Sequence, residues 1–592
     1  MTTRDQLFNY LFQTKVAGWT PLTARYHDYF SEEEVALIER SSRSFLAEKR
    51  TVVELFFENR FASLGGLAAV VKQLPQELRK QGERVLVLTP LHIKNRVVRK
   101  AMQTGALKEC FCDLPVSVCE YSAKVSCYKE VDASLPTYHI GIKGRFRAGD
   151  NPYGYEEPEQ LLLDSLSFCA VVPSVCARLG YTSHVLFHAH DWECAAIALF
   201  ARYAVISSLV DQVRTVLTLH NSFDAALPER YQLQFFGKKC PVYTVLQCML
   251  PLVHGPLTTV STPFAHELRN DPLQSTVFTD HLQDLFRRNP PLGIENGMFV
   301  KPEKIFSDQA LSNASKGDVR LLYQEKQKNR DGFFSVIKAS RRKKAIGSFT
   351  DEARVPAIPV LFMSGRYDHA QKGFDVIFNA FSRLPKGAVN LFFTPTLHND
   401  DDDLSYFSDI AEAFAGHVVI WPFKISSKEY MQCLRGASYL VMPSFYEPFG
   451  AASEGFLNGT PLLARATGGL LAQVQPEETF VMPDQYASIL PSGGHDTANG
   501  ILYKEQYDGA DVSEQWRALL QLPFKERMTN PIYVSMVDAA HEALEKAIQY
   551  YHDPQRYALM IFEGLHAARQ FTWDKAVEKY GTVFDVASYR GI

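Results

Sequence analysis

Short apolar runs alternate with amphipathic stretches along most of the chain, and this alternation predicts strands that are each followed by a helix. The first run, 51–57 (TVVELFF), precedes a helical pattern at 68–80, and the next run, 84–89, ends at Pro90. Runs this short and this apolar are typical of strands buried on both faces of a sheet. A strand, a helix and a second strand in this order predict a parallel sheet with right-handed crossovers.

The same alternation continues along the chain, with one interruption. Residues 91–145 show short segments such as 116–121 and 124–128, which predict an antiparallel excursion from the parallel sheet. After residue 505 the pattern is helical, at 534–551, 553–567 and 573–582. We predict further strands at 185–188, 213–219, 360–363, 390–394, 417–421, 439–442 and 461–464, and further helices at 158–179, 319–339, 374–381 and 426–434.

The clearest domain boundary lies at 300–356, where Lys, Arg, Ser and Asp dominate. The basic run 341–344 is typical of a solvated face or linker, and an anionic partner is the alternative. Ser31 and Glu34 predict a capped amphipathic helix, to which no chemistry is assigned. We predict a helical extension at 1–50, an α/β domain at 51–320, a charged linker or insertion at 321–356, a second α/β domain at 357–560 and a final helical segment at 561–592.

Composition excludes several classes of protein. The chain has 592 residues, 46% of them hydrophobic, which is enough for more than one core. A net charge of −4 gives no basic footprint for nucleic acid. No apolar run approaches the ~18 residues of a membrane span, and the first residues lack a signal-peptide core. The closest cysteines, Cys110 and Cys112, lack zinc or redox spacing, so we expect free thiols in a reducing cytoplasm.

The stretch 439–471 holds the densest set of candidate site residues. An apolar run at 439–442 is followed by Glu447 and Gly450, and a second short strand leads to Thr-Gly-Gly at 467–469. Charges and glycines thus lie at the carboxyl ends of strands, where ligands bind in open α/β sheets. Backbone N–H groups at a helix start suit an anion such as a diphosphate, and ordinary turn chemistry is the alternative.

Other loops offer compatible chemistry. Arg366 and Lys372 lie on one strand-to-helix loop, where they can clamp a diphosphate; solubility is the bland alternative. Gly65 and Gly66 follow the first strand and either admit a phosphate or allow a close strand–helix crossing. His220 ends the strand at 213–219, where an imidazole can bind a sugar hydroxyl or steady positive charge, or serve only a structural purpose.

The motifs together resemble those of the glycogen and starch synthase family, which comprises retaining, nucleotide-sugar-dependent glycosyltransferases. The resemblance extends over about residues 51–592, with its motifs in the family's order. The matching strings are G-G-L at 65–67, H-x-H-D-W at 188–192, T-x-H-N at 218–221, G-I-x-N-G at 293–297, G-R-x-x-x-x-x-K-G at 365–373, E-P-x-G at 447–450 and T-G-G-L at 467–470.

The chain departs from the family's pattern at four positions. Ser63 occupies the place of the family's donor-binding Lys, and Ala69 replaces an acidic residue. Glu193 stands where the family often has His, and Glu454 lies one residue before the family's ribose-binding Glu. Loss of a Lys removes a charge that is directed at the donor's phosphates, so the departures bear on donor identity and catalytic rate.

The resemblance implies a fold and a reaction. The fold class is α/β, with two facing Rossmann-like domains (GT-B architecture) and an interdomain donor cleft. Residues 51–320 would form the acceptor side, 357–560 the nucleotide-sugar side, and the last helix would cross back to the first domain. The reaction would move glucose from ADP-glucose or UDP-glucose to the non-reducing end of an α-1,4-glucan, with retention of configuration. The leaving phosphate would take the acceptor's proton, so catalysis would be positioning plus charge stabilisation.

The resemblance also implies the partners and the site. No cofactor is expected, because the nucleotide sugar is a substrate, and no D-x-D or His cluster demands a metal. No nucleic acid or membrane partner is expected, and a homo-oligomer stays open. The implied catalytic residues are Glu447, His220, Asp191, Arg366 and Lys372; the donor-binding residues are Gly65, Gly66, Asn221, Arg366, Lys372, Glu447, Phe449, Gly450, Glu454, Thr467, Gly468 and Gly469; the acceptor-side residues are Tyr153, Asp191 and Trp192.

Three alternatives stay open at this stage. The first is a retaining glycosyltransferase of the same fold that uses a lipid, protein or small-sugar acceptor. The second is a scaffold that binds glucan or nucleotide sugar with little or no turnover, which Ser63 and Ala69 motivate. The third is a phosphorylase-like degrader, for which no cofactor-lysine motif is present. The sequence does not decide the donor base, the acceptor, the oligomeric state or the roles of 1–50 and 341–344.

Overall fold

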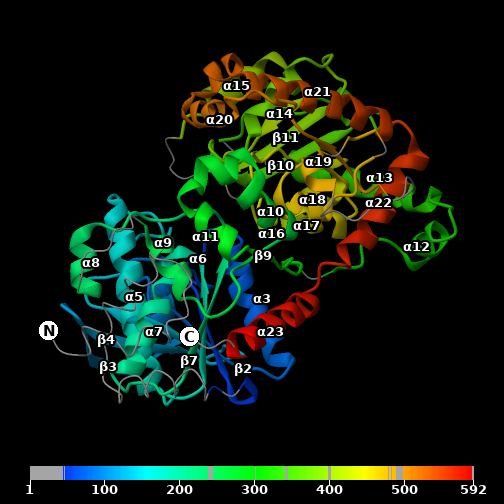
Figure 1. Cartoon of the computed structure of the whole chain (residues 1–592). Coiled ribbons are helices and arrows are strands. Elements are labelled where there is room, and N and C mark those ends of the chain that lie inside the picture. Colours follow the sequence, from blue (N-terminus) through cyan, green and yellow to red (C-terminus); the bar gives the residue numbers. More distant parts are fainter. Residues whose placement is uncertain are drawn as a thin grey trace. The chain divides into compact units, whose positions relative to one another are not determined.

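The chain forms two compact units, and each is described by itself. The structure, a computed structural model, describes residues 45, 47–237, 244–300, 302–339, 344–397, 402–423, 425–477, 479–481, 483–487 and 498–589 (Figure 1). Most of the predicted N-terminal extension, and 341–343 of the basic run, lie outside the described residues. Unit 1 holds the residues up to Val260, Phe278–Gly297 and those from Trp573 on; unit 2 holds Ser261–Val277 and Met298–Thr572.

Unit 1 is built on a sheet whose described strands run in the order β3-β4-β5-β2-β1-β6-β7-β8-β9. Neighbours from β5 to β9 pair in parallel, whereas β3–β4 and β4–β5 are antiparallel, which confirms both predictions for this region. The strands are β1 (Thr51–Leu55), β2 (Arg84–Pro90), β3 (Leu107–Val118), β4 (Tyr121–Glu130), β5 (Thr137–Ile142), β6 (Val185–His190), β7 (Val213–Leu219), β8 (Thr258–Thr259) and β9 (Leu292–Gly293).

The β3–β4 hairpin is much longer than the predicted strands at 116–121 and 124–128. Most side chains of β3 are exposed, because it is the edge strand of the sheet. The register also shifts between Glu109 and Phe111 and again between Phe111 and Leu114. Bulges of this kind break the two-residue period on which strand prediction depends.

The helices of unit 1 cover its sheet. The final helix, α23, belongs to unit 1 and packs against α3 and β7. The helices are α3 (Leu67–Lys80), α4 (Arg96–Gln103), α5 (Pro158–Arg178), α6 (Asp191–Ala195), α7 (Ile197–Ile206), α8 (Glu229–Phe236), α9 (Val245–Met249), α11 (Gln283–Arg288) and α23 (Trp573–Tyr589).

Helix α5 is, within the described residues, the one helix long and apolar enough to cross a membrane. In the most apolar window of this helix, 72% is buried inside the structure. It packs against α6, α7, α8 and β3 of unit 1. Its apolar surface therefore packs against other elements of unit 1, as in the core helix of a globular domain.

Unit 2 contains a sheet whose described strands are all parallel, in the order β12-β11-β10-β13-β14-β15. The strands are β10 (Val360–Arg366), β11 (Asn390–Thr396), β12 (Val418–Ile420), β13 (Tyr439–Met442), β14 (Leu462–Arg465) and β15 (Gly500–Tyr503). The helices are α10 (Thr262–Asn270), α12 (Asp308–Ala314), α13 (Arg320–Ala339), α14 (Phe374–Ser382), α15 (Ser405–Ala413), α16 (Ser427–Gly436), α17 (Ala452–Leu457), α18 (Gly468–Gln473), α19 (Asp484–Ala487), α20 (Val512–Gln521), α21 (Pro531–Tyr551) and α22 (Pro554–Ala568).

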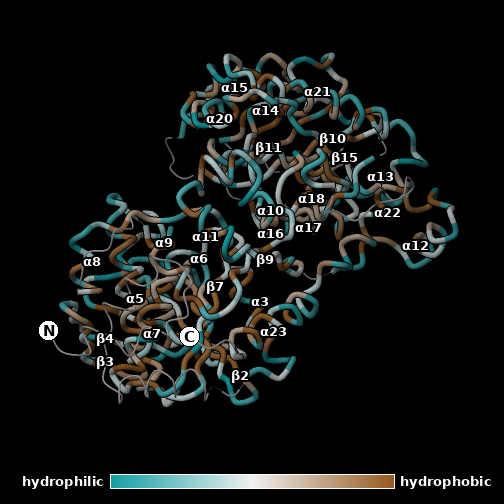
Figure 2. The backbone as a smooth tube through the Cα atoms, in the orientation of Figure 1, coloured by the Kyte–Doolittle hydropathy of each residue, from teal (hydrophilic) through white to brown (hydrophobic). Residues whose placement is uncertain are grey.

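Apolar residues make up the interior of each unit; Figure 2 colours the hydrophobic segments of the backbone brown. In unit 2, Phe362 stacks on Phe392 across neighbouring strands, and Trp421 meets Phe392 edge-on. Helix α16 begins with a capping box in which Ser426 and Glu429 satisfy each other's backbone N–H groups. A local cap thus fixes where α16 begins, and packed aromatic rings hold neighbouring strands of the sheet together.

Among the parallel strands of each sheet, the strand order reverses at one place. In unit 1 the reversal lies between β1 and β6, and in unit 2 between β10 and β13. The loops that leave neighbouring strands in opposite directions open a crevice at the carboxyl edge of a parallel sheet, where ligands bind. The strand order therefore predicts two candidate ligand-binding places, one in each unit.

Candidate functional site

In unit 2, the predicted cations and Glu447 meet at the reversal of the sheet. Arg366 is the last residue of β10, and Lys372 lies on the loop that leads to α14. Glu447 follows β13, the neighbour of β10. Gly373, with φ of +54°, starts α14, and a Cβ there would lie 2.4 Å from the carbonyl oxygen of Pro443. The Lys372 loop and the Glu447 loop therefore touch only because position 373 is glycine.

A hydrogen-bonded ion pair forms the centre of this group. The Lys372 Nζ lies 2.6 Å from Glu447 Oε2, and the Ser444 hydroxyl donates to the same oxygen at 2.8 Å. The two charged side chains are 16% and 10% exposed. Arg366 donates from Nη2 to Gln371 Oε1 at 2.8 Å. Two cations and a carboxylate in one partly buried group can bind an anionic leaving group and accept hydrogen bonds from hydroxyls.

The Thr-Gly-Gly turn supports the Glu447 loop. The amide of Gly469 donates to the carbonyl oxygen of Glu447 at 2.9 Å. A Cβ at Gly468 would lie 2.1 Å from that same oxygen, and one at Gly469 would lie 2.3 Å from the backbone of Phe449. These glycines are needed for close backbone approach. Their amides are satisfied inside the unit, so a diphosphate could bind them only by displacing those partners.

Glu267, on α10, is a residue that sequence reasoning missed. This buried carboxylate accepts hydrogen bonds from the Gly468 amide at 2.8 Å, the Thr467 hydroxyl at 3.0 Å and the Tyr486 hydroxyl at 2.9 Å. Burial, followed by the charge of Asp271, raises the pKa of Glu267 to about 7. Glu267 is separated by about two hundred residues from the turn that it holds, and no local pattern signals such a pair.

The remaining predicted donor residues of unit 2 are Phe449 and Gly450, on the Glu447 loop, and Glu454 on α17. Gly450 has φ of +81°, and a Cβ there would lie 2.8 Å from Cγ of Glu447. The carbonyl oxygen of Phe449 accepts a hydrogen bond from Gln473. Glu454 lies on α17, where the Tyr430 hydroxyl donates to its Oε2 at 3.2 Å, and burial raises the pKa of Glu454. The predicted contact of Glu454 with a ribose stays a prediction.

In unit 1, Asp191 and His220 meet at the ends of β6 and β7. The buried Asp191 Oδ1 accepts a hydrogen bond from the His220 amide at 2.6 Å. Burial is the main reason that the pKa of Asp191 rises to about 7. Asp191 has φ of +61°, a left-handed conformation that costs a non-glycine residue about 1 kcal/mol or more. Such strain at a ligand-binding edge is typical of functional positions.

Tyr153 and Gly65, two further predicted residues of unit 1, lie near Glu58. Tyr153 stacks on Phe57, and burial together with Glu58, Glu193 and Asp191 raises the pKa of Tyr153 well above its usual value. The amides of Leu64 and Gly65 donate to Glu58 Oε2 at 2.9 and 3.4 Å. The glycine loop therefore already binds a carboxylate in this structure.

Three further predicted positions behave differently. Gly66 caps the start of α3 without a side-chain cap. Asn221 Oδ1 accepts a hydrogen bond from the Phe223 amide at 2.8 Å, and so shapes the loop after β7. Trp192 is 6% exposed and packs in the interior of unit 1. Contacts of these residues with a donor or acceptor stay predictions.

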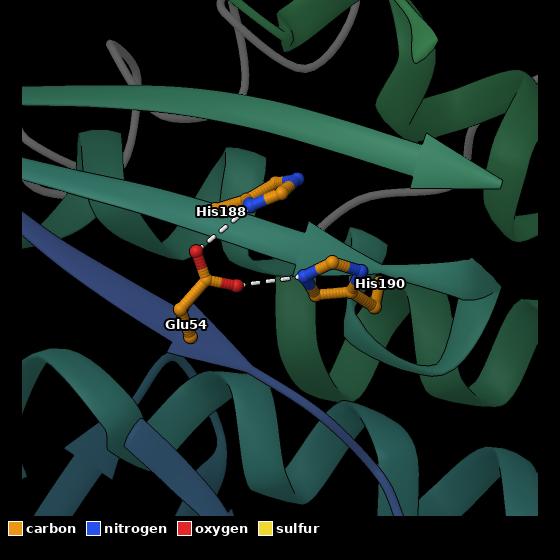
Figure 3. Close-up of side chains that lie close together, drawn as sticks. All are labelled: Glu54, His188 and His190. Atoms are coloured by element: carbon orange, nitrogen blue, oxygen red, sulfur yellow. Dashed lines mark hydrogen bonds and ion pairs between the residues drawn. The ribbon is translucent and has the colours of Figure 1, made fainter. Parts of the chain in front are cut away.

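A network of hydrogen-bonded, buried polar side chains spans the reversal between β1 and β6 (Figure 3). Glu54 Oε1 lies 3.0 Å from His188 Nδ1, and Glu54 Oε2 lies 2.8 Å from His190 Nε2. His190 Nδ1 lies 2.8 Å from His220 Nε2. Sequence reasoning quoted both histidines in a motif but gave no role to Glu54. Its signal was available: a lone carboxylate within the apolar run of β1, pairing in register with His188.

Comparison with known proteins shows which families the chain resembles. The family model described as the starch synthase catalytic domain matches residues 57–277, and one described as family 4 glycosyltransferase in conflict systems matches 334–579. The chain is 26% identical over 463 residues to glycogen synthase of Geobacillus thermodenitrificans, covering 74% of this chain and 86% of the relative. It is 26% identical over 439 residues to glycogen synthase of Thermotoga maritima, covering 70% and 82%.

A solved structure shows the same fold. The catalytic domain of starch synthase IV from Arabidopsis thaliana, bound to ADP and acarbose, matches with a TM-score of 0.65 and 18% identity. The match covers 91% of this chain and all of that one. The predicted GT-B architecture is thereby confirmed. The starch synthase domain model and the glycogen synthase relatives support the glycogen and starch synthase family of glycosyltransferases as the family that this chain resembles.

Proposed function

We propose that this protein transfers glucose from ADP-glucose or UDP-glucose to the non-reducing end of an α-1,4-glucan, with retention of configuration. The resemblance to the family supports the glycogen or starch synthase type of reaction. The observation that carries the site is the meeting of Arg366, Lys372 and Glu447 at the strand reversal of unit 2. An anionic leaving group and a polyhydroxyl substrate are what these three side chains can bind together.

Arg366 and Lys372 would hold the diphosphate as it leaves. Arginine offers a planar fork of donors and lysine a point charge, so the two stabilise negative charge that grows in the transition state. Before substrate binds, Glu447 and the Ser444 hydroxyl position the Lys372 loop and the Glu447 loop. Glu447 would accept hydrogen bonds from hydroxyls of the donor sugar, as the family resemblance implies.

Unit 1 would supply His220 and Asp191 to the reacting sugar. Burial lowers the pKa of His220 to about 3, so its imidazole is neutral at working pH. A neutral ring can bind a sugar hydroxyl without repelling the positive charge that develops on the sugar. We expect no cofactor, because the nucleotide sugar is itself a substrate, and a cytoplasmic location.

A binding scaffold with little turnover is the second candidate. Ser63, where the resemblance expects a donor-binding Lys, is exposed and brings no positive charge to the glycine loop of unit 1. The amides of Leu64 and Gly65 are directed at Glu58 instead. A donor phosphate near this loop would therefore find fewer stabilising partners than the family pattern offers.

The deciding experiment is incubation of the full chain with radiolabelled ADP-glucose or UDP-glucose and glycogen. Label in the polymer, with release of an equal amount of nucleotide, is the expected result. Nucleotide release without polymer label would point to a different acceptor. Binding of the sugar nucleotide without turnover would favour the scaffold. Analysis of the labelled chain ends with α- and β-specific glucosidases tests the retention of configuration.

A further inference from the structure

The buried hydrogen-bond network in unit 1 connects β1 to the loop after β7. Glu54 lies on β1, and His188 and His190 lie on β6, with their rings directed to opposite oxygens of one carboxylate (Figure 3). On one side the network continues from His188 Nε2 to the Thr218 hydroxyl at 2.8 Å. On the other side it continues from His190 Nδ1 to His220 Nε2 at 2.8 Å. Both ring nitrogens of each β6 histidine are therefore engaged.

The positions of the protons follow from the carboxylate. An ionised carboxylate only accepts hydrogen bonds, so both rings that face Glu54 must direct N–H groups at it. Two such donors are what a buried negative charge requires. His190 then carries its proton on Nε2 when neutral, and its Nδ1 accepts a hydrogen bond. The donor to that nitrogen is Nε2–H of His220, which leaves Nδ1 of His220 without a proton.

The neutral state of His190 and His220 agrees with the surroundings of these two rings. Burial, followed by His188 and His220, lowers the pKa of His190 well below its usual value. Burial likewise lowers the pKa of His220. Other titratable groups of unit 1 nearby include Asp191, whose Oδ1 accepts from the His220 amide, and Tyr580 of α23, whose ring packs on His188. Neither of these groups donates to a ring nitrogen of His220 in the described structure. Glu58 and Glu193 lie close to Asp191 in turn.

We propose that Glu54 is a positioning residue that acts through His190. It holds His220 in the Nε2–H tautomer and so presents Nδ1 of His220 as a hydrogen-bond acceptor. His220 is only half-buried, and no described residue donates a hydrogen bond to its Nδ1. That nitrogen is thus available to a hydroxyl donor, which under the proposed function is a hydroxyl of the sugar. The statement about the sugar rests on the proposed function, whereas the tautomer does not.

The tautomer can be measured directly by solid-state ¹⁵N NMR of the full chain labelled at histidine. Protonated and unprotonated ring nitrogens have distinct shifts, and the His220→Gln variant identifies the His220 signals among the 17 histidines. In the unaltered protein we expect one tautomer of His220, with Nδ1 unprotonated. A protonated Nδ1 would overturn the inference, because it would mean that the proton order runs the other way from Glu54.

Two variants at position 54 separate the hydrogen bond from the charge. Glu54→Met removes the acceptor, so His220 should populate both tautomers and kcat should fall on the order of 10²-fold, because a misplaced catalytic group costs about that much. Glu54→Gln keeps one acceptor for His190. Its amide can donate to His188, since the Thr218 hydroxyl can accept as well as donate. Glu54→Gln should therefore keep the His220 tautomer and a rate within a few-fold of the unaltered enzyme.

Thr218→Val is the matched control. This substitution removes the hydrogen bond between His188 and Thr218 and leaves the one between His190 and His220 intact. We expect the unaltered tautomer of His220 and a rate within a few-fold. Equal effects of Thr218→Val and Glu54→Met would mean that the network is merely structural and would overturn the inference. Should Glu54→Met fail to fold, as judged by circular dichroism, the spectra of the unaltered protein and of Glu54→Gln still decide.

Two other results bear on the inference. Stoichiometric zinc in the purified protein, lost on replacing His188, would contradict it, because a metal bound by Glu54, His188 and His190 would take the place of the protons that the inference assigns to His188 Nδ1 and His190 Nε2. Absence of glucosyl transfer with the expected tautomers would defeat the proposed function alone. The inference about Glu54 would then stand on the spectra.

Discussion

At the scale of single residues, the proposed function of unit 2 depends on charges held in a partly buried group. Arg366 lies at the end of β10 and is held by Gln371 rather than by a carboxylate in the described structure. Its guanidinium is therefore not neutralised by that contact. Lys372, in contrast, is already paired with Glu447. The two cations should differ in what their removal does to the rest of the loop.

Arg366→Ala should lower kcat by about 10²- to 10³-fold, the usual cost of removing one donor aimed at developing negative charge. Folding should be unaffected, because the side chain bonds only to Gln371 among the described contacts. Initial-rate measurements of glucosyl transfer test this. Arg383→Ala, which removes a surface arginine paired with Asp538 in the same unit, is the control and should keep full activity. Near-normal transfer by the Arg366 variant would remove this residue from the site.

Glu447→Ala should abolish transfer and also leave the Lys372 charge without its partner. Removal of one member of a partly buried ion pair costs stability, because the remaining charge is desolvated without compensation. We expect a lower melting temperature for Glu447→Ala than for Glu447→Gln, whose amide oxygen can still accept from Lys372 and Ser444. Differential scanning fluorimetry beside the transfer assay measures both effects. Equal melting temperatures would contradict the role of the pair.

At the scale of elements, the turn at 467–469 positions the Glu447 loop through backbone contacts. Gly468→Ala should destabilise unit 2 by more than about 2 kcal/mol, because the new Cβ meets the Glu447 carbonyl oxygen at 2.1 Å and φ is +47°. Gly332→Ala is the control: it lies within α13, with open space around its Cβ, and should stabilise by up to about 1 kcal/mol. Urea denaturation compares the two. A neutral Gly468→Ala would mean that the turn is more pliable than its geometry indicates.

At the scale of the whole molecule, buried acids make stability depend on pH. The pKa of Glu267 is raised by burial from 4.5 to about 7, so folded protein binds its proton more tightly than unfolded protein does. The contribution of protonated Glu267 to the free energy of unfolding is fully present below about pH 4.5 and is lost as pH rises through about 7. The loss is on the order of 3 kcal/mol.

Glu267→Gln should therefore flatten this dependence. The variant should be less stable than, or equal to, the unaltered protein at pH 5 and gain relative stability as pH rises to 8. Denaturation at both pH values measures the difference, with the exposed Glu514→Gln as control. A pH dependence of the unaltered protein that survives in Glu267→Gln would assign the effect elsewhere, for example to Asp191 in unit 1.

Transfer by the whole enzyme should not need a divalent cation. Arg366 and Lys372 would supply the positive charge that a metal supplies to diphosphates in other enzymes. Activity after dialysis against EDTA, compared with activity after readdition of Mg²⁺ or Mn²⁺, tests this expectation. A loss of activity that a cation restores would contradict it.

Much of the fold could be predicted from local pattern. The bounds of β7 and β13 agree with the predicted 213–219 and 439–442, because buried parallel strands are continuous apolar runs between polar turns. The β3–β4 hairpin was underpredicted, because exposure and bulges erase the period. The motif order also predicted the family and placed Arg366, Lys372 and Glu447 at strand ends.

What the sequence by itself determined is many of the strands and helices, the parallel character of most strand pairs, the resemblance to the family and the residues that follow strand ends, because each of these depends on neighbours along the chain. The tertiary structure alone decided which of them share a hydrogen bond. Glu54 meets His190, and Glu267 meets Gly468, across gaps of about one hundred and forty and two hundred residues. Such pairs arise because folding brings distant strand ends and helices to one edge of a sheet, and a buried polar group is stable only where that edge supplies its partner.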